Sequence, residues 1–320
     1  MMPNQNAKNC LKCYKLLSMG ENYYHTKCVK DFFGVDELPL FNINLDEIAE
    51  YAQIQVSNKL SITGVQKKLS VGYDNTNSKI TVIGYRDDFI LKLPSSDYPE
   101  IEFNEDLTMH LANIVGLKTV PHILIPLDNS FAYLTKRIDR MADNKKHMED
   151  FCQLSEKLTE YKYQGSHELI TRIIRKFSEL SNFDLLTLFD LTMFNYLVSN
   201  NDMHLKNYSL LYDRQISLSP AYDLLNTRLY INSKDDPEDF ALSMNGKKSN
   251  FKLEDFLLFG KYLKLNDKQV QNIINKYIKL KPKLLEKIDQ SFLNDILKEQ
   301  YKNDLENRYL LLNSESNTIS

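Results

Sequence analysis

Two aspartates and an asparagine in the stretch NNDMHLKNYSLLYDRQISLSPAYD have the types and spacing that phosphoryl transfer requires. Asp202 and Asn207 follow the pattern D-x4-N, and Asp223 comes after a short apolar segment. In phosphoryl transfer the protein performs little covalent chemistry, so a site needs one carboxylate to orient the attacking hydroxyl and oxygen ligands to hold Mg2+ on the phosphates. Asp202 is the candidate for the first role, and Asn207 and Asp223 are the candidate Mg2+ ligands.

The segment between Asn207 and Asp223 predicts a strand, a polar turn and a second strand, which would return Asp223 to the side of the loop that carries Asp202. Protein kinases have the same D-x4-N spacing in their catalytic loop, followed by a second aspartate. We therefore expect the three side chains to converge on one Mg-nucleotide. On its own D-x4-N is frequent by chance and is typical of a polar turn after a helix. His204, inside the motif, is expected to hold the loop in shape and not to carry the proton.

An upstream β-rich stretch offers a lysine for the phosphates. FILKLP places Lys92 between apolar residues, which counts against an ordinary solvated strand lysine. The following segment, NEDLTMHLANIVG, has the apolar spacing of a helix, and Gly116 would cap its end. Glu105, or less favourably Glu102, would pair with Lys92.

Other candidates for nucleotide contacts surround this lysine. SITGVQKKLSV contains a single glycine between two β-type runs rich in hydroxyls and lysines, as a loop over phosphates would be built, but it is not G-x-G-x-x-G. TKRID falls where a connection flanking the adenine is expected. The residues expected to contact ATP are Ser61, Thr63, Gly64, Val65, Gln66, Lys92, Lys136 and Arg137.

Four residues near the N-terminus that can ligate a metal form a separate motif. Cys10, Cys13, His25 and Cys28 follow C-x2-C-x11-H-x2-C, a set that suits tetrahedral Zn2+. The alternative is that these are reduced cysteines without a metal. Four cysteines in 320 residues are no disulfide framework, which favours a reducing, cytoplasmic location. Delivery into a host cell stays open.

Composition and patterning predict the scaffold. With 42% apolar residues, 26% charged residues and a net charge of −3, the chain lacks the cationic field that non-specific nucleic-acid binding uses. No apolar run is long enough for a membrane span. We predict an α+β, two-lobed protein-kinase-like fold. Its parts are a Cys/His segment over 1–34, a β-rich N-lobe over 35–140 and a mainly helical C-lobe over 141–320. FDLLTLFDLTMFNYLVSN, apolar nearly all round, should be a buried helix.

The ordered motifs resemble those of the HipA-like bacterial serine/threonine kinases, the toxins of toxin–antitoxin systems. They cover about residues 60–250 and are SITGVQKKLSV, ILKLPS, NEDLTMHLA, HMEDFCQL, KYQGS, NNDMHLKN, LSPAYDLL and ALSMNGKK. The chain looks closest to the shorter HipT-type kinases, because the N-terminal subdomain of longer HipA proteins is missing before the phosphate loop. The resemblance implies ATP and Mg2+ as cofactors, Asp202 as the catalytic aspartate, Asn207 and Asp223 as Mg2+ ligands and Lys92 as the phosphate-contacting lysine.

The resemblance also implies substrates and partners. Known members phosphorylate serine or threonine hydroxyls, and family targets include aminoacyl-tRNA synthetases, whose inactivation stops translation and growth. A small antitoxin that resembles the missing subdomain and a helix-turn-helix antitoxin, which would bring indirect DNA contact, are the expected partners. No membrane partner is expected.

Ser61 and Thr63 match positions where relatives autophosphorylate, with Thr63 replacing a serine of some members. A phosphate there would add about −1.5 to −2 charge to a loop that covers ATP phosphates, so it should alter activity. The alternative is that these hydroxyls only cap or bend the loop.

Two other functions remain open at the level of the sequence. One is a phosphotransferase on the same scaffold that acts on a small molecule or a lipid headgroup. The other is a catalytically silent binding module, which is disfavoured because Lys92, Asp202, Asn207 and Asp223 are all present.

Overall fold

The computed structural model describes residues 8–41, 66–74, 76–81, 87–127, 130–141 and 144–313. The chain divides into two compact units. The β-rich unit comprises Met1–Asp106 and Val120–Lys145, and the helical unit comprises Leu107–Thr119 and Lys146–Ser320. The predicted α+β class is confirmed.

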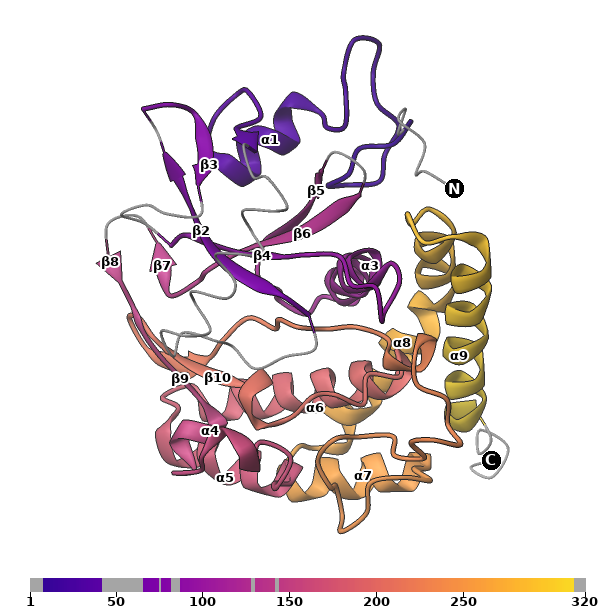
Figure 1. Cartoon of the computed structure of the whole chain (residues 1–320). Coiled ribbons are helices and arrows are strands. Elements are labelled where there is room, and N and C mark those ends of the chain that lie inside the picture. Colours follow the sequence, from indigo (N-terminus) through magenta and orange to yellow (C-terminus); the bar gives the residue numbers. More distant parts are fainter. Residues whose placement is uncertain are drawn as a thin grey trace. The chain divides into compact units, whose positions relative to one another are not determined.

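The β-rich unit is built on a six-stranded sheet with the order β1-β3-β2-β4-β6-β5 (Figure 1). Its pairs are antiparallel except for β1 with β3, which is parallel. A two-stranded sheet of β7 and β8 completes the strands described in this unit. The strands are β1 (Leu40–Phe41), β2 (Lys68–Asp74), β3 (Lys79–Thr81), β4 (Phe89–Lys92), β5 (His122–Pro126), β6 (Phe131–Lys136), β7 (Arg140–Met141) and β8 (Asn144–Lys145).

Two helices carry residues that the sequence singles out as site candidates. Helix α1 (Thr26–Phe33) packs Phe32 on Phe89 of β4, with ring centroids 5.8 Å apart. It ends at Gly34, whose φ of 80° is the left-handed conformation that glycine adopts without a Cβ clash. Helix α3 (Ile101–Ile114) carries Glu102 and Glu105 in its first turns. Its predicted C-terminal glycine, Gly116, has a φ of 83°.

The helical unit is organised around α6 (Ser181–Leu197), which packs against α5, α7, α9 and β11 (Figure 1). Most of its apolar residues are buried, among them the run from Leu191 to Leu197, so the predicted buried helix is confirmed, although Phe183 in its first turn is 58% exposed. The other helices of this unit are α4 (Phe151–Leu154), α5 (His167–Phe177), α7 (Leu253–Tyr262), α8 (Asp267–Asp289) and α9 (Asp295–Asn313). The 3-10 helices are η1 (Thr159–Tyr161), η2 (Leu205–Asn207) and η3 (Thr227–Leu229).

A three-stranded antiparallel sheet in the helical unit has the order β11-β10-β9. Its strands are β9 (His147–Asp150), β10 (Ser209–Tyr212) and β11 (Ile216–Leu218). Because β10 and β11 pair as a hairpin, the predicted strand, turn and strand after Asn207 are confirmed.

The apolar stripe of α8 is buried at Val270, Ile273, Ile274 and Tyr277. Ile278 also fits the i, i+3, i+4, i+7, i+8 apolar spacing that the sequence shows from Val270 onward, but it is 46% exposed. Within the part of the chain that the structure describes, no helix has the length and apolarity needed to cross a membrane.

Candidate active site

The loop after α6 holds Asp202 and Asn207 together through its own backbone. Asn207 donates from Nδ2 to the carbonyl oxygen of Asp202 over 3.1 Å, and the backbone N–H of His204 donates to the same oxygen over 2.8 Å. The backbone N–H of Asp202 donates to Oδ1 of the fully buried Asn200 over 3.2 Å. Since the Nδ2 group of Asn207 is used in this way, its Oδ1 atom is the side-chain oxygen left for a cation.

The carboxylate of Asp202 accepts a hydrogen bond from the Tyr163 hydroxyl, with 2.8 Å between the oxygens. Burial, followed by the negative charges of Asp202 and Asp223, raises the pKa of Tyr163, so the phenol stays protonated and remains a donor. Tyr163 lies in the KYQGS motif, but no role could be assigned to it from the sequence. Nothing in the local spacing links it to Asp202, which lies on a distant segment.

The hairpin returns the chain toward this loop, as the sequence predicted. Tyr222, the residue before Asp223, donates its hydroxyl proton to the carbonyl of Lys206 over 3.0 Å, and Ser209 contacts the same phenol oxygen over 2.6 Å. Asp223 itself has a φ of 60°. A left-handed backbone is costly for a residue with a Cβ, and such strain concentrates at functional sites.

His204 is enclosed in the same loop and acts there as an uncharged group. Burial lowers its pKa, although the charges of Asp202 and Asp223 oppose that shift. Its ring packs edge-on against Tyr163, with centroids 5.1 Å apart. A neutral, buried ring suits the loop-shaping role better than proton transfer to bulk solvent.

Two other motifs support the loop from outside. Asp150 accepts from Lys206 Nζ over 2.6 Å and also caps α4, so the HMEDFCQL motif is tied to the segment between Asp202 and Asn207. Gly165 lies against Leu205, whose side-chain carbons would be only 3.0 to 3.1 Å from a Cβ at that position. The KYQGS loop thus depends on a glycine to approach the catalytic loop.

The β-rich unit contains a buried ion pair. Lys92 Nζ lies 2.6 and 2.7 Å from the two carboxylate oxygens of Glu105, and the side chains are 6% and 3% exposed. The ammonium group also lies over the ring of Tyr133 at 5.5 Å from its centroid. Glu105 rather than Glu102 therefore pairs with Lys92, as expected. Burial raises the pKa of Glu102 to about 7, and its Oε2 atom has no hydrogen-bond partner among the residues described.

The remaining predicted ATP contacts divide between described and undescribed residues. Gln66 donates from Nε2 to the carbonyl of Leu93 over 2.6 Å. Burial lowers the pKa of Lys136, whose ammonium group lies 5.2 Å from the ring centroid of Phe32. Arg137 forms ion pairs with Asp87 and Asp139. Four of the predicted residues lie outside the described ranges: Ser61, Thr63, Gly64 and Val65.

The cysteine and histidine residues of the N-terminal segment are brought together. The Sγ atoms of Cys10, Cys13 and Cys28 and a ring nitrogen of His25 all lie within 4.8 Å of one another.

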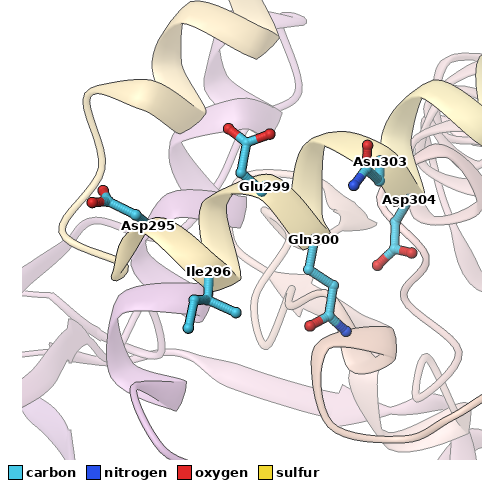
Figure 2. Close-up of a pocket in the computed structure, with 6 residues that line it drawn as sticks. All are labelled: Asp295, Ile296, Glu299, Gln300, Asn303 and Asp304. Atoms are coloured by element: carbon cyan, nitrogen blue, oxygen red, sulfur yellow. The ribbon is translucent and has the colours of Figure 1, made fainter.

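A surface pocket on α9 contains none of the predicted site residues (Figure 2). It is lined by residues of that helix alone: Asp295, Ile296, Glu299, Gln300, Asn303 and Asp304. Gln300 donates to the carbonyl of Arg228 and Asp304 accepts from Asn226, so part of its polar lining already serves the packing of the helix.

Residues 60–284 match the HipA-like C-terminal domain. The chain belongs to this family. Two similar Sinorhizobium fredii proteins are named "Putative kinase Y4dM", 34% identical over 195 residues, and "Putative kinase Y4mE", 32% identical over 182 residues. The matches cover 55% and 54% of this chain but 47% and 43% of those proteins, so the chain spans less than half the length of either. A Haemophilus influenzae protein named "Putative kinase" is 25% identical over 268 residues, which are 75% of this chain and 78% of that protein.

Two solved structures share the fold. The HipA of a Shewanella oneidensis toxin–antitoxin system, solved with HipB and operator DNA, has a TM-score of 0.70 at 18% identity and covers 93% of this chain and 80% of its own. The Helicobacter pylori proinflammatory kinase CtkA has a TM-score of 0.54 at 19% identity, over 72% of this chain and 87% of its own. The predicted kinase-like fold is thereby confirmed. The nearer resemblance to HipT-type kinases stays a prediction.

Proposed function

We propose that this member of the HipA-like family is a Mg-ATP-dependent protein kinase that transfers the γ-phosphate to a serine or threonine hydroxyl. The observation that carries the proposal is the hydrogen bond from the Asn207 side chain to the backbone carbonyl of Asp202, because it ties the two residues of the D-x4-N motif together in one loop, as phosphoryl transfer in a kinase requires. The buried pair of Lys92 and Glu105 supports it from the β-rich unit.

Each residue has a role that follows from its surroundings. Asp202 would accept the hydrogen bond of the substrate hydroxyl, with Tyr163 holding one carboxylate oxygen so that the other meets the substrate. Lys92, kept in place by Glu105, would contact the ATP phosphates. His204 would keep the loop in shape.

The side chains at Asn207 and Asp223 fit a hard cation, since each offers oxygen, the ligand atom that Mg2+ prefers. When bound, Mg2+ would neutralise charge on the phosphates. Gln66, Lys136 and Arg137 would contribute to nucleotide binding, together with the loop residues from Ser61 to Val65. The N-terminal cysteine and histidine cluster would take Zn2+ as a separate, structural cofactor.

We further propose that the kinase acts as a toxin in the cytoplasm and inhibits translation and growth, with an aminoacyl-tRNA synthetase as the target class. The support is family membership and the fold shared with a HipA solved with HipB and operator DNA. A small antitoxin that resembles the N-terminal subdomain of longer HipA proteins and a helix-turn-helix antitoxin, contacting DNA indirectly, would be the partners. Autophosphorylation at Ser61 or Thr63 would modulate the activity.

The test uses purified chain, radiolabelled ATP, Mg2+ and a bacterial lysate. Asp202→Asn is the test variant, and Asp235→Asn, at an exposed aspartate of the same unit, is the matched control. We expect labelled protein bands with the wild type and with the control, and none with Asp202→Asn. Label confined to small molecules or lipids would favour a different phosphotransferase. A complete absence of label, with no thermal shift on adding Mg-ATP, would leave the catalytically silent binding module as the remaining hypothesis.

A further inference from the structure

The four ligand atoms near the N-terminus have the spacing of a tetrahedral metal site. Cys13 Sγ and Cys28 Sγ lie 3.4 and 3.8 Å from Nδ1 of His25. Bond lengths of about 2.3 Å for Zn–S and about 2.0 Å for Zn–N give tetrahedral edges of about 3.5 Å between sulfur and nitrogen and about 3.8 Å between sulfurs. The limit of 4.8 Å on all distances within the set leaves room for one ion and no more. We call Cys10, Cys13, His25 and Cys28 the Cys3His cluster.

The orientation of the histidine ring is fixed by the backbone. His25 Nε2 donates to the carbonyl of Leu16 over 2.9 Å, so the proton sits on Nε2 and the lone pair of Nδ1 faces the sulfurs. A metal-ligating histidine usually has its other ring nitrogen bonded to such an acceptor. No disulfide joins any of the chain's four cysteines. Four ligands, with three thiols among them, make the closed set that is typical of structural zinc.

Two tyrosines connect this segment to the rest of the β-rich unit, and each is the sequence neighbour of a cluster residue. Tyr14, which follows Cys13, donates to Oδ2 of Asp106 over 2.5 Å. Tyr24, which precedes His25, donates to the carbonyl of Leu124 in β5 over 2.5 Å. Both side chains are buried. In Figure 1 the segment runs beside β5. We call Tyr14 and Tyr24 the anchoring tyrosines.

Asp106 is adjacent in the sequence to Glu105, a residue of the candidate kinase site. Asp106 is fully buried and also accepts from His122 Nδ1 over 2.7 Å, so it is held between the N-terminal segment and β5. Its neighbour on α3 is Glu105, the partner of Lys92. A displacement of Asp106 would therefore rotate or shift the turn of helix that presents Glu105.

We propose that the Cys3His cluster binds one structural Zn2+, which clamps the N-terminal segment through the anchoring tyrosines onto the helix that presents Glu105 to Lys92. The cluster lies outside residues 60–284, so the family match does not include this site. The metal fixes the positions of the residues next to the tyrosines, and so adds to the order that the buried Leu11, Val29 and Phe32 give the segment. Kinases need the lysine–glutamate pair in place for transfer, so the last link of the clamp rests on the proposed function.

The first test is the metal content of the full chain purified from medium supplemented with zinc. Mass spectrometry of the elements should find about one zinc per chain, unchanged in Cys152→Ala, the matched control at the cysteine outside the cluster. Cys28→Ala should lose the zinc. Iron at one equivalent in place of zinc, or substoichiometric metal in the wild type, would overturn the assignment.

The second test measures the clamp without using activity. Hydrogen exchange of peptides covering α3 and β5 should accelerate about tenfold or more when a zinc chelator is added to the wild type. Tyr14→Phe should keep its zinc but show part of this acceleration, which separates the clamp from simple misfolding of a cysteine variant. Unchanged exchange after complete zinc removal would overturn the clamp. Zinc and exchange effects together with no phosphoryl transfer would refute the proposed kinase and leave the zinc site standing.

Discussion

Breaking the buried pair of Lys92 and Glu105 should destabilise the β-rich unit far more than removing both charges together. Both side chains are almost fully enclosed, and each Nζ–Oε distance is below 2.8 Å. Removing one partner leaves the other charge buried without the opposite charge of this pair, which costs about 3–5 kcal/mol. Replacing both by apolar residues removes the desolvation cost of both charges and is often neutral or stabilising. We therefore expect Lys92→Met and Glu105→Leu each to cost about 3–5 kcal/mol, and the double variant to lie within about 1 kcal/mol of the wild type.

The assay is a double-mutant cycle from urea unfolding at pH 7, with exchange of α3 peptides reporting on the β-rich unit. The coupling energy should be at least about 5 kcal/mol. All three variants should lose phosphoryl transfer, because the lysine or its positioning partner is gone. Single variants that cost less than about 1 kcal/mol, or effects that simply add, would refute the reasoning that this pair is a buried, mutually dependent unit.

Three further changes have effects that follow from single contacts. Burial is the main cause that raises the pKa of Glu102 from 4.5 to about 7, so the folded state binds a proton that the unfolded state has lost. The free energy of unfolding should therefore fall by about 3 kcal/mol as the pH rises from 4.5 to 7. Glu102→Gln should reduce this pH dependence, measured by urea unfolding at pH 5 and pH 8. Tyr163→Phe removes one hydrogen bond to Asp202 and should lower the transfer rate about twofold to tenfold, with little change in thermal stability; an unchanged rate would deny the tyrosine its positioning role. Gly165→Ala should destabilise the helical unit by about 1–3 kcal/mol by pressing on Leu205, and a thermal midpoint equal to that of the wild type would contradict this.

Much of the fold could be predicted from local features of the sequence. The helix α6 could be predicted because its apolar residues face every direction, and the hairpin of β10 and β11 because two β-type runs flank a polar turn. The choice of Glu105 as the partner of Lys92 was also within reach, since a strand lysine with apolar neighbours needs an acid from the next helix.

The remaining contacts join residues that are far apart in the sequence, and no local pattern reveals them. Tyr163 reaches Asp202 from another loop, and Tyr14 reaches Asp106 across 92 positions of sequence. Ile278 follows the apolar spacing of α8 yet remains exposed, although Leu284 and Ile288 further along the helix are buried, because the spacing does not reveal how wide the packed face of a helix is. Aspartate tolerates a left-handed backbone better than most residues, but nothing in the sequence marks Asp223 among the aspartates as the one that adopts it.

Phosphopeptide mapping with ATP labelled by heavy oxygen in the γ-phosphate would decide whether Asp202 serves a protein kinase. Wild type, Asp202→Asn and Asp235→Asn would each be incubated with Mg2+, labelled ATP and a bacterial lysate, and the heavy phosphate would be located by mass spectrometry. We predict heavy phosphate on serine or threonine of a lysate protein with the wild type and Asp235→Asn, and none with Asp202→Asn. Heavy phosphate on the same residues with Asp202→Asn, or on no protein in any sample, would contradict the assignment.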